Sequence, residues 1–160
     1  MENKKDKIKA VVFGHAVGDA LGVPVEFCRR EELTQAPVTT MTGYGSYPVP
    51  AGAWSDDTSM ALAALDILSC GKINEFEIMV NFAMWLDEGR FTPTGECFDV
   101  GRTCMNAIRS FISRCYTKEN GFVHPFDFDL TECGECGETS NGNGSLMRIH
   151  PFSLMIWYKK

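Results

Sequence analysis

The chain has 160 residues and a formal net charge of −6, from 15 Lys and Arg against 21 Asp and Glu. Hydrophobic residues make up 44% and charged residues 22%, which supplies a core and excludes a wholly disordered chain. The length fits a single domain over residues 1–160. The negative charge argues against nucleic acid as a partner, because binding to a phosphate backbone needs a basic surface.

The cellular context is predicted from leader, membrane and cysteine patterns. The charged residues between Glu2 and Lys9 are unlike a secretory leader. No uninterrupted apolar run approaches the roughly 18 residues that span a bilayer, so we expect no membrane partner. The seven cysteines are scattered and odd in number, which is typical of reduced thiols. We therefore expect a cytoplasmic protein.

The first predicted helix ends near Leu21, before Pro24, because its apolar residues recur at helical spacing up to that point. A long connection over residues 27–54 follows, and connections of that length in compact domains usually carry function. A second helix is expected to begin after Ser55, a good N-cap, and to end at Gly71.

A third helix is predicted between Asn74, which caps it with Glu77 at the capping-box position, and Gly89. Asp99 is a candidate cap for a fourth helix. A last amphipathic segment is expected to kink or restart at Pro151. Because no alternating strand pattern competes with these elements, the predicted fold class is all-α with long functional loops.

The apolar run over residues 153–158 is followed only by Lys159 and Lys160. A helix this apolar needs partners to cover it. We therefore expect this segment to pack against a complementary chain segment or to mediate self-association.

Ser55, Asp56, Asp57 and Thr58 lie at the start of the second predicted helix. One interpretation is helix-end chemistry, with a serine cap and two carboxylates favoured by the helix dipole. The other is a site for a hard cation such as Mg²⁺, Mn²⁺ or Ca²⁺. Adjacent helical residues point about 100° apart, so the two carboxylates suit two neighbouring ions better than one. Ser55 and Thr58 share a face and could add oxygen ligands.

Two further acidic residues and a histidine lie near the end of the first predicted helix. Glu26 follows Pro24 in a semi-apolar loop, where a carboxylate is costly unless it is paired or metal-bound. The alternative is a solvated loop glutamate. Asp19 is interpreted as a surface or loop-bracing residue, and His15 as a structural histidine with satisfied hydrogen bonds.

A glycine-rich stretch over residues 140–145 is expected to open into a helix. Such backbone can aim N–H groups at an anion, so phosphate binding is one interpretation and a simple turn is the other. Asp99 and Gly101 form a similar loop-to-helix junction, where helix capping is the default. Cys133 and Cys136 make a CxxC pair, but no further ligands have zinc spacing, which favours free thiols over a zinc site.

Four motifs in series resemble one family. They are GDALGVPVEF at 18–27, GAWSDDTSM at 52–60, FTPTGECFDVGRT at 91–103 and SNGNGSLMRIHP at 140–151. Together they are similar to the ADP-ribosylglycohydrolases, the group that includes dinitrogenase-reductase-activating glycohydrolase. The resemblance implies an orthogonal all-α helical bundle with two Mg²⁺ or Mn²⁺ ions. It also implies hydrolysis that releases ADP-ribose from a modified protein side chain or a related conjugate.

The same resemblance implies roles for individual residues. Ser55, Asp56 and Asp57 would be metal ligands. Glu26 and Asp57 would be catalytic, with Glu26 positioning the attacking water or the scissile linkage. The residues implied to bind ADP-ribose are Asp99, Gly101, Ser140, Asn141, Gly142, Asn143 and Gly144.

The resemblance also implies a further C-terminal half with an Asp-x-Asp-Thr motif, which this sequence does not contain. The chain therefore resembles an N-terminal half, and we expect its second metal site to be incomplete. The expected partners are an ADP-ribosylated protein or conjugate and a complementary C-terminal half. The alternative to a hydrolase is a non-catalytic ADP-ribose-binding or structural remnant, similar to the J-type crystallins.

Overall fold

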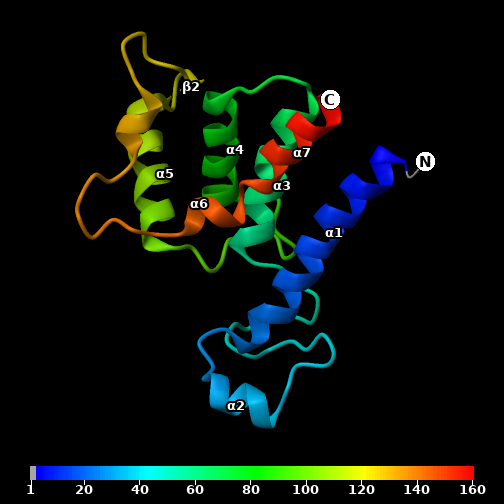
Figure 1. The fold of residues 1–160 in the computed structure, drawn as a ribbon. Helices are drawn as coiled ribbons and strands as arrows, with labels where there is room; N and C mark the ends of the chain where they lie inside the picture. Colours follow the sequence, from blue (N-terminus) through cyan, green and yellow to red (C-terminus); the bar gives the residue numbers. More distant parts are fainter. Residues whose placement is uncertain (1–2) are drawn as a thin grey trace.

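The computed structural model describes residues 3–160 and is mostly helical (Figure 1), which confirms the predicted all-α class. The longer helices, in chain order, are α1 (Lys4–Gly22), α3 (Asp56–Ser69), α4 (Glu75–Glu88), α5 (Arg102–Cys115) and α7 (His150–Lys159). The shorter elements are η1 (Val23–Val25), α2 (Arg30–Gln35), η2 (Leu130–Cys133) and α6 (Gly144–Met147). Strands β1 (Tyr116–Thr117) and β2 (Gly121–Phe122) form an antiparallel pair after α5, which the sequence did not predict.

The hydrophobic core lies among α3, α4 and α5, with α7 packed along α3 (Figure 1). Met60 of α3, Trp85 of α4, and Ile108 and Phe111 of α5 are each less than 2% exposed. Burying one such side chain stabilises the folded state by about 1.5–3 kcal/mol. This core holds the starts of α3 and α5 in fixed relative positions.

The boundaries of α3 and α4 follow the predicted capping chemistry. Ser55 is the N-cap of α3 and accepts a hydrogen bond from the Asp57 N–H. Asn74 caps α4 by accepting from the Glu77 N–H at 3.2 Å. Gly89 ends α4 in the left-handed conformation, with φ at 68°, which glycine adopts without steric cost. The caps at Ser55 and Asn74 and the stop at Gly89 are confirmed, whereas within residues 3–160 the Glu77 side chain returns no capping-box bond to Asn74.

The prediction that Asp99 caps a helix is wrong. The helix α5 begins after Gly101, and no side chain caps it. Asp99 has a φ of 55° and accepts a hydrogen bond from the Tyr47 hydroxyl. A contact with a residue distant in the sequence has therefore replaced the local cap.

The predicted connection over residues 27–54 contains α2, which the sequence did not indicate. This short helix has no buried residue, so it leaves no apolar periodicity in the sequence. Its main signal is Glu32, whose carboxylate accepts a hydrogen bond from the Arg29 N–H at 3.2 Å.

Helix α1 is largely uncovered, with Ala20 as its one buried residue. Within Lys4–Val25, a window of 18 residues has a mean hydropathy of 1.3 and is 11% buried, so this helix is long and apolar enough to cross a membrane by length and composition only. The core helix of a soluble protein and a signal sequence meet the same criterion. His15 Nε2 is buried with no hydrogen-bond partner among residues 3–160, so the prediction of a satisfied histidine is wrong.

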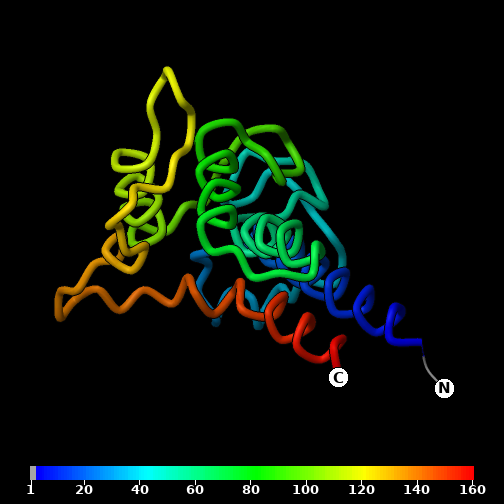
Figure 2. The backbone as a smooth tube through the Cα atoms, turned by 90° about the horizontal axis from the view of Figure 1, so that it is seen from above, coloured from blue at the N-terminus to red at the C-terminus, as the bar shows by residue number. Residues whose placement is uncertain are grey.

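Helices α1 and α7 lie side by side near the two ends of the chain (Figure 2). The rings of His15 and His150 are 4.4 Å apart. Both helices expose apolar side chains, and we call these residues the α1–α7 surface: Val11, Phe13 and Val17 of α1 with Ile156 and Tyr158 of α7. Phe13 is 67% exposed and Tyr158 is 59% exposed. The expectation that the apolar end of the chain lacks full cover is confirmed.

Candidate active site

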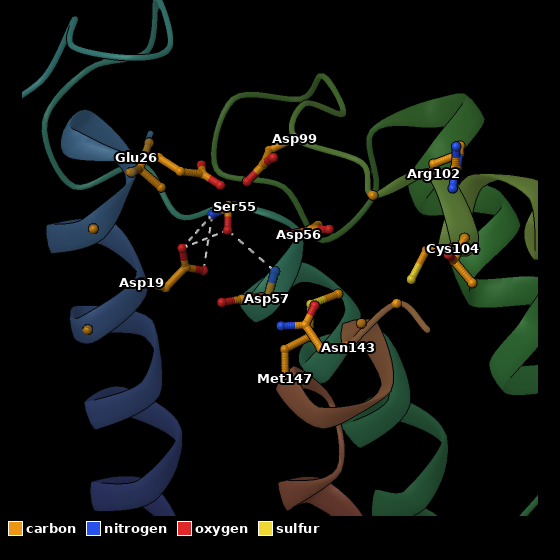
Figure 3. A pocket seen from close by; sticks show the side chains of 17 residues that line it. Asp19, Glu26, Ser55, Asp56, Asp57, Asp99, Arg102, Cys104, Asn143 and Met147 are labelled. Carbon is orange, nitrogen blue, oxygen red and sulfur yellow. Dashed lines mark hydrogen bonds between the residues drawn. The ribbon is translucent and has the colours of Figure 1, made fainter. Parts of the chain in front are cut away.

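A cavity of about 660 Å³ opens where the ends of several helices meet (Figure 3). The end of α1 and the segment after it, the start of α3, the loop into α5 and the start of α6 all contribute to its wall. The polar and glycine residues that line it include Asp19, Glu26, Ser55, Asp56, Asp57, Asp99, Gly101, Arg102, Gly142, Asn143 and Gly144. Segments that are far apart in the sequence therefore form one acidic pocket.

Most of the site residues expected from the sequence line this pocket, but Ser140 and Asn141 do not. The Ser140 hydroxyl donates to Glu135 at 3.2 Å, and the Asn141 amide donates to the Glu138 carbonyl at 3.1 Å. Their side chains are engaged within their own loop, outside the cavity.

Asp19 fixes the start of α3 from the neighbouring helix. Its carboxylate accepts from the Ser55 hydroxyl at 2.7 Å, from the Ser55 N–H at 3.0 Å and from the Thr58 N–H at 3.0 Å. These N–H groups are among those that a helix start leaves without internal partners. The interpretation of Asp19 as a bracing residue is confirmed, and it joins α1 to the predicted metal ligands.

Asp56 and Asp57 point in different directions from the start of α3 (Figure 3), as their adjacent positions on a helix predict. Burial, with the nearby charges of Asp99 and Asp57, raises the pKa of Asp56 to about 7. Burial and the charge of Asp19 also raise the pKa of Asp57. Burial and, secondly, mutual repulsion disfavour the charged carboxylates until a cation neutralises them.

The oxygen donors fit part of a hard-cation site. Carboxylate and hydroxyl oxygens are the preferred ligands of Mg²⁺ and Mn²⁺, and Thr58 Oγ1 is buried with no hydrogen-bond partner among residues 3–160. In that part of the chain, no group of three or more His, Cys, Asp or Glu side chains is placed to hold a metal ion. The described residues therefore supply part of a ligand set and do not complete one.

Glu26 and Asp99 point toward one another across the pocket (Figure 3). Burial and the charge of Asp99 raise the pKa of Glu26 to about 7. The Tyr47 hydroxyl donates to Asp99 Oδ1 at 2.6 Å. Sequence reasoning missed Tyr47, although the length of the connection that carries it indicated a functional segment.

The glycine-rich stretch forms the opposite wall, against the start of α5. A Cβ at Gly142 would lie 2.7 Å from Thr103 Oγ1, and one at Gly144 would lie 2.5 Å from Cys104 Sγ. A side chain at either position would displace the side chain of Thr103 or Cys104, so glycine permits this close approach as packed. The start of α5 carries no side-chain cap, and Gly101, Arg102 and Thr103 line the pocket, so this helix start is suited to an anion.

The CxxC pair does not gather zinc ligands. Cys133 is buried and Cys136 is exposed, and all seven cysteines are free. Neither this loop nor the rest of residues 3–160 contains a group of three or more His, Cys, Asp or Glu side chains placed to hold a metal ion.

A helical fold with a carboxylate-rich pocket beside a glycine-lined wall is suited to a cation and a phosphate-bearing ligand together. The family model described as ADP-ribosylglycohydrolase matches residues 1–160, and the chain belongs to the ADP-ribosylglycohydrolase family. The resemblance carried by the four sequence motifs is confirmed.

The chain is also similar to individual proteins that are named as ADP-ribosyl hydrolases. The chain is 36% identical over 108 residues, 67% of its length, to an ADP-ribosylarginine hydrolase Tri1 of Serratia proteamaculans, and it covers 29% of that protein. It is 30% identical over 154 residues to the Tri1 of Pseudomonas putida, covering 96% of this chain and 37% of the relative. It is 33% identical over 152 residues to the ADP-ribosyl-[dinitrogen reductase] glycohydrolase of Rhodospirillum rubrum, covering 93% of this chain and 44% of the relative. The chain thus spans less than half the length of these relatives.

Proposed function

We propose that this pocket serves the hydrolysis of an ADP-ribosyl glycosidic linkage, releasing ADP-ribose from a modified protein side chain or related conjugate. The observation that carries the proposal is the meeting of five carboxylates and a glycine-lined wall in one cavity: Asp19, Glu26, Asp56, Asp57 and Asp99 with Gly142 and Gly144. The chain spans less than half of its relatives, so the proposed activity is that of the whole protein to which this pocket contributes.

In this proposal Asp56 and Asp57, with Ser55, hold Mg²⁺ or Mn²⁺ together with ligands outside the described residues. When bound, such ions stabilise negative charge and polarise oxygen atoms of the substrate. Glu26 accepts a proton from the attacking water, a role suited to a carboxyl whose pKa is about 7. Cleavage of a glycosidic bond passes through an oxocarbenium-like state, which nearby carboxylates stabilise.

We further propose ADP-ribosylated arginine as the substrate linkage. Two relatives are named as ADP-ribosylarginine hydrolases. A guanidinium group is permanently cationic and binds carboxylates through directed hydrogen bonds. Asp99 and Glu26, which face each other in the pocket (Figure 3), offer carboxylates to such a group.

Calorimetric titration with ADP-ribose, with and without Mg²⁺, tests the proposal on the chain as it exists. We expect binding that Mg²⁺ strengthens and that Asp57→Asn weakens by about tenfold, the scale of a lost charge-assisted contact. The matched control is Asp127→Asn, because Asp127 is exposed and does not line the pocket. Equal affinities in both variants would contradict the assignment of Asp57.

The alternative function is a non-catalytic ADP-ribose-binding or structural protein. The observation that favours it is the lack of a three-ligand metal group within residues 3–160. Turnover of ADP-ribosylarginine separates the two functions. Release of ADP-ribose that depends on Mg²⁺ or Mn²⁺ supports the hydrolase, whereas metal-independent binding without release supports the alternative.

We propose that the α1–α7 surface is covered by a complementary segment of an ADP-ribosylglycohydrolase. The support is the exposure of Phe13 and Tyr158, together with the greater length of the relatives. Light scattering after size-exclusion chromatography tests this proposal. A heterodimer formed on mixing with the unmatched part of a relative supports it, and a homodimer that excludes this segment contradicts it.

We also propose a cytoplasmic location, which the free cysteines support.

A further inference from the structure

The segment that carries Tyr47 is docked against η1 and Glu26, directly after α1. The Ser46 N–H donates to the Pro24 carbonyl at 3.0 Å, and the Ser46 hydroxyl donates to the Glu26 carbonyl at 2.5 Å. A Cβ at Gly45 would overlap the Pro24 carbonyl, so the backbone approaches more closely here than any other residue type allows. Tyr47 therefore projects from a fixed backbone.

Tyr47 reaches from this segment to the loop before α5, on the other side of the pocket. Its hydroxyl lies 2.6 Å from Asp99 Oδ1. Its ring packs 5.2 Å from the ring of Phe98 and 6.5 Å from that of Phe27. The contact joins residues that are 52 positions apart in the sequence.

Asp99 has a backbone that needs this kind of support. Its φ of 55° lies in the left-handed region, where a non-glycine residue persists only if its surroundings hold it. The neighbouring Phe98 ring is fixed by the ring of Tyr47, so the same side chain restrains both the backbone and the carboxylate of this loop.

We propose that Tyr47 is a positioning residue, whose hydroxyl holds one carboxylate oxygen of Asp99 and thereby turns that carboxylate toward Glu26 and the pocket. The inference rests on the proposed function, in which Asp99 contacts the ADP-ribosyl ligand. Tyr47 is not among the residues that line the pocket, and its hydroxyl interacts with Glu26 as well as with Asp99, so it acts through these two carboxylates, chiefly that of Asp99.

The contact is tested by NMR on chain labelled with ¹³Cζ-tyrosine. The chain has four tyrosines, and the signal that disappears in Tyr47→Phe is the one that belongs to Tyr47. We expect Asp99→Asn to shift that signal, because the acceptor of the phenol hydroxyl changes from a charged to a neutral group. An unchanged signal would show that the hydroxyl is not bonded to Asp99, and the proposal would be overturned.

The positioning role is tested by the affinity for ADP-ribose in the presence of Mg²⁺. We expect Tyr47→Phe, which keeps the ring, to weaken binding by about tenfold, the scale of a lost hydrogen bond to a charged group. The matched control is Tyr44→Phe, which removes a hydroxyl from the same segment at a residue that is 75% exposed. Both variants should keep the wild-type circular dichroism spectrum, and Tyr47→Phe should lower the melting temperature because a hydrogen bond to a carboxylate is lost.

A double-mutant cycle separates positioning from a general structural effect. Because Tyr47 acts chiefly through Asp99, Tyr47→Phe should cause a smaller loss in an Asp99→Asn background than in the wild type. Additive losses, or full affinity in Tyr47→Phe, would overturn the proposal. A wild-type chain that does not bind ADP-ribose would instead contradict the proposed function, while the NMR signal still decides the Tyr47 to Asp99 contact.

Discussion

The core among α3, α4 and α5 and the helix α1 are covered to very different extents. Trp85 in the last turn of α4 is fully buried, whereas Ala20 is the one buried residue of α1. The core is held by apolar packing, and α1 is joined to α3 chiefly through the carboxylate of Asp19. The comparison shows that the chain uses apolar burial to build its scaffold and polar contacts to assemble its site.

The largest effect is expected from Trp85→Ala, which tests the core half of the comparison. Removing a fully buried aromatic side chain leaves a cavity and should lower the free energy of unfolding by about 3–5 kcal/mol. Urea denaturation followed by circular dichroism measures this loss. The control is Phe13→Ala on α1, where the side chain is 67% exposed and the loss should stay below about 1 kcal/mol. Similar losses at both positions would contradict the comparison.

Asp19→Ala breaks the polar connection between α1 and α3. The change removes the acceptor of the Ser55 and Thr58 N–H groups, so we expect unfolding to require about 1–3 kcal/mol less. Hydrogen exchange should become faster in the first turn of α3 and stay unchanged in α4. Asp6→Ala, at the exposed start of α1, is the control, and an equal change there would contradict the role of Asp19.

The pH dependence of stability tests the electrostatics of the assembled site. The pKa of Asp56 is raised to about 7 in the folded chain, so folding retains a proton that the unfolded chain releases near pH 4. The stabilisation by the protonated carboxyl is present below about pH 4 and is lost as the pH rises toward 7.

Asp56→Asn, which stays neutral, should therefore match the wild type at pH 4 and melt at a higher temperature at pH 7.5 without metal. Burial and the charge of His15 lower the pKa of His150, which makes stability rise with pH in the same range. His150 is present in both proteins, so its effect cancels when the melting temperature of the wild type is subtracted from that of Asp56→Asn at each pH. A difference that does not depend on pH would contradict the raised pKa of Asp56.

The smallest effect on stability is expected at the α1–α7 surface. Phe13→Ser removes an exposed aromatic ring, so the free energy of unfolding should change by less than about 0.5 kcal/mol. Fluorescence of the dye ANS, which binds exposed apolar surface, should fall in the same variant. Unchanged fluorescence would show that this surface does not bind the dye.

The helices of the core were predictable because their signals are local. Ser55 and Asn74 cap the helices that follow them, and Gly89 ends α4. The outcome differs at Asp99, whose short-range pattern indicates a cap, while its observed partner Tyr47 lies 52 residues away. Contacts of this range depend on how the loops pack, which a single sequence does not specify.

The candidate site was predicted to a similar extent. Residues such as Glu26 and Asp57 were assigned from motifs, and they meet in one pocket. Ser140 and Asn141 belong to the same motif as Gly142, yet their side chains bind acceptors in their own loop. Motif membership places a residue near a site, and local hydrogen bonding decides whether its side chain faces the cavity.

The single carboxylate of Asp19 between α1 and α3 has a dynamic consequence. Because few apolar contacts hold α1, its separation from α3 is a local opening with a smaller free energy than global unfolding. The opening divides the pocket wall, since Glu26 follows α1 and Asp57 starts α3. A ligand that bridges these two walls binds only the closed form, so its occupancy and the docking of α1 are thermodynamically linked.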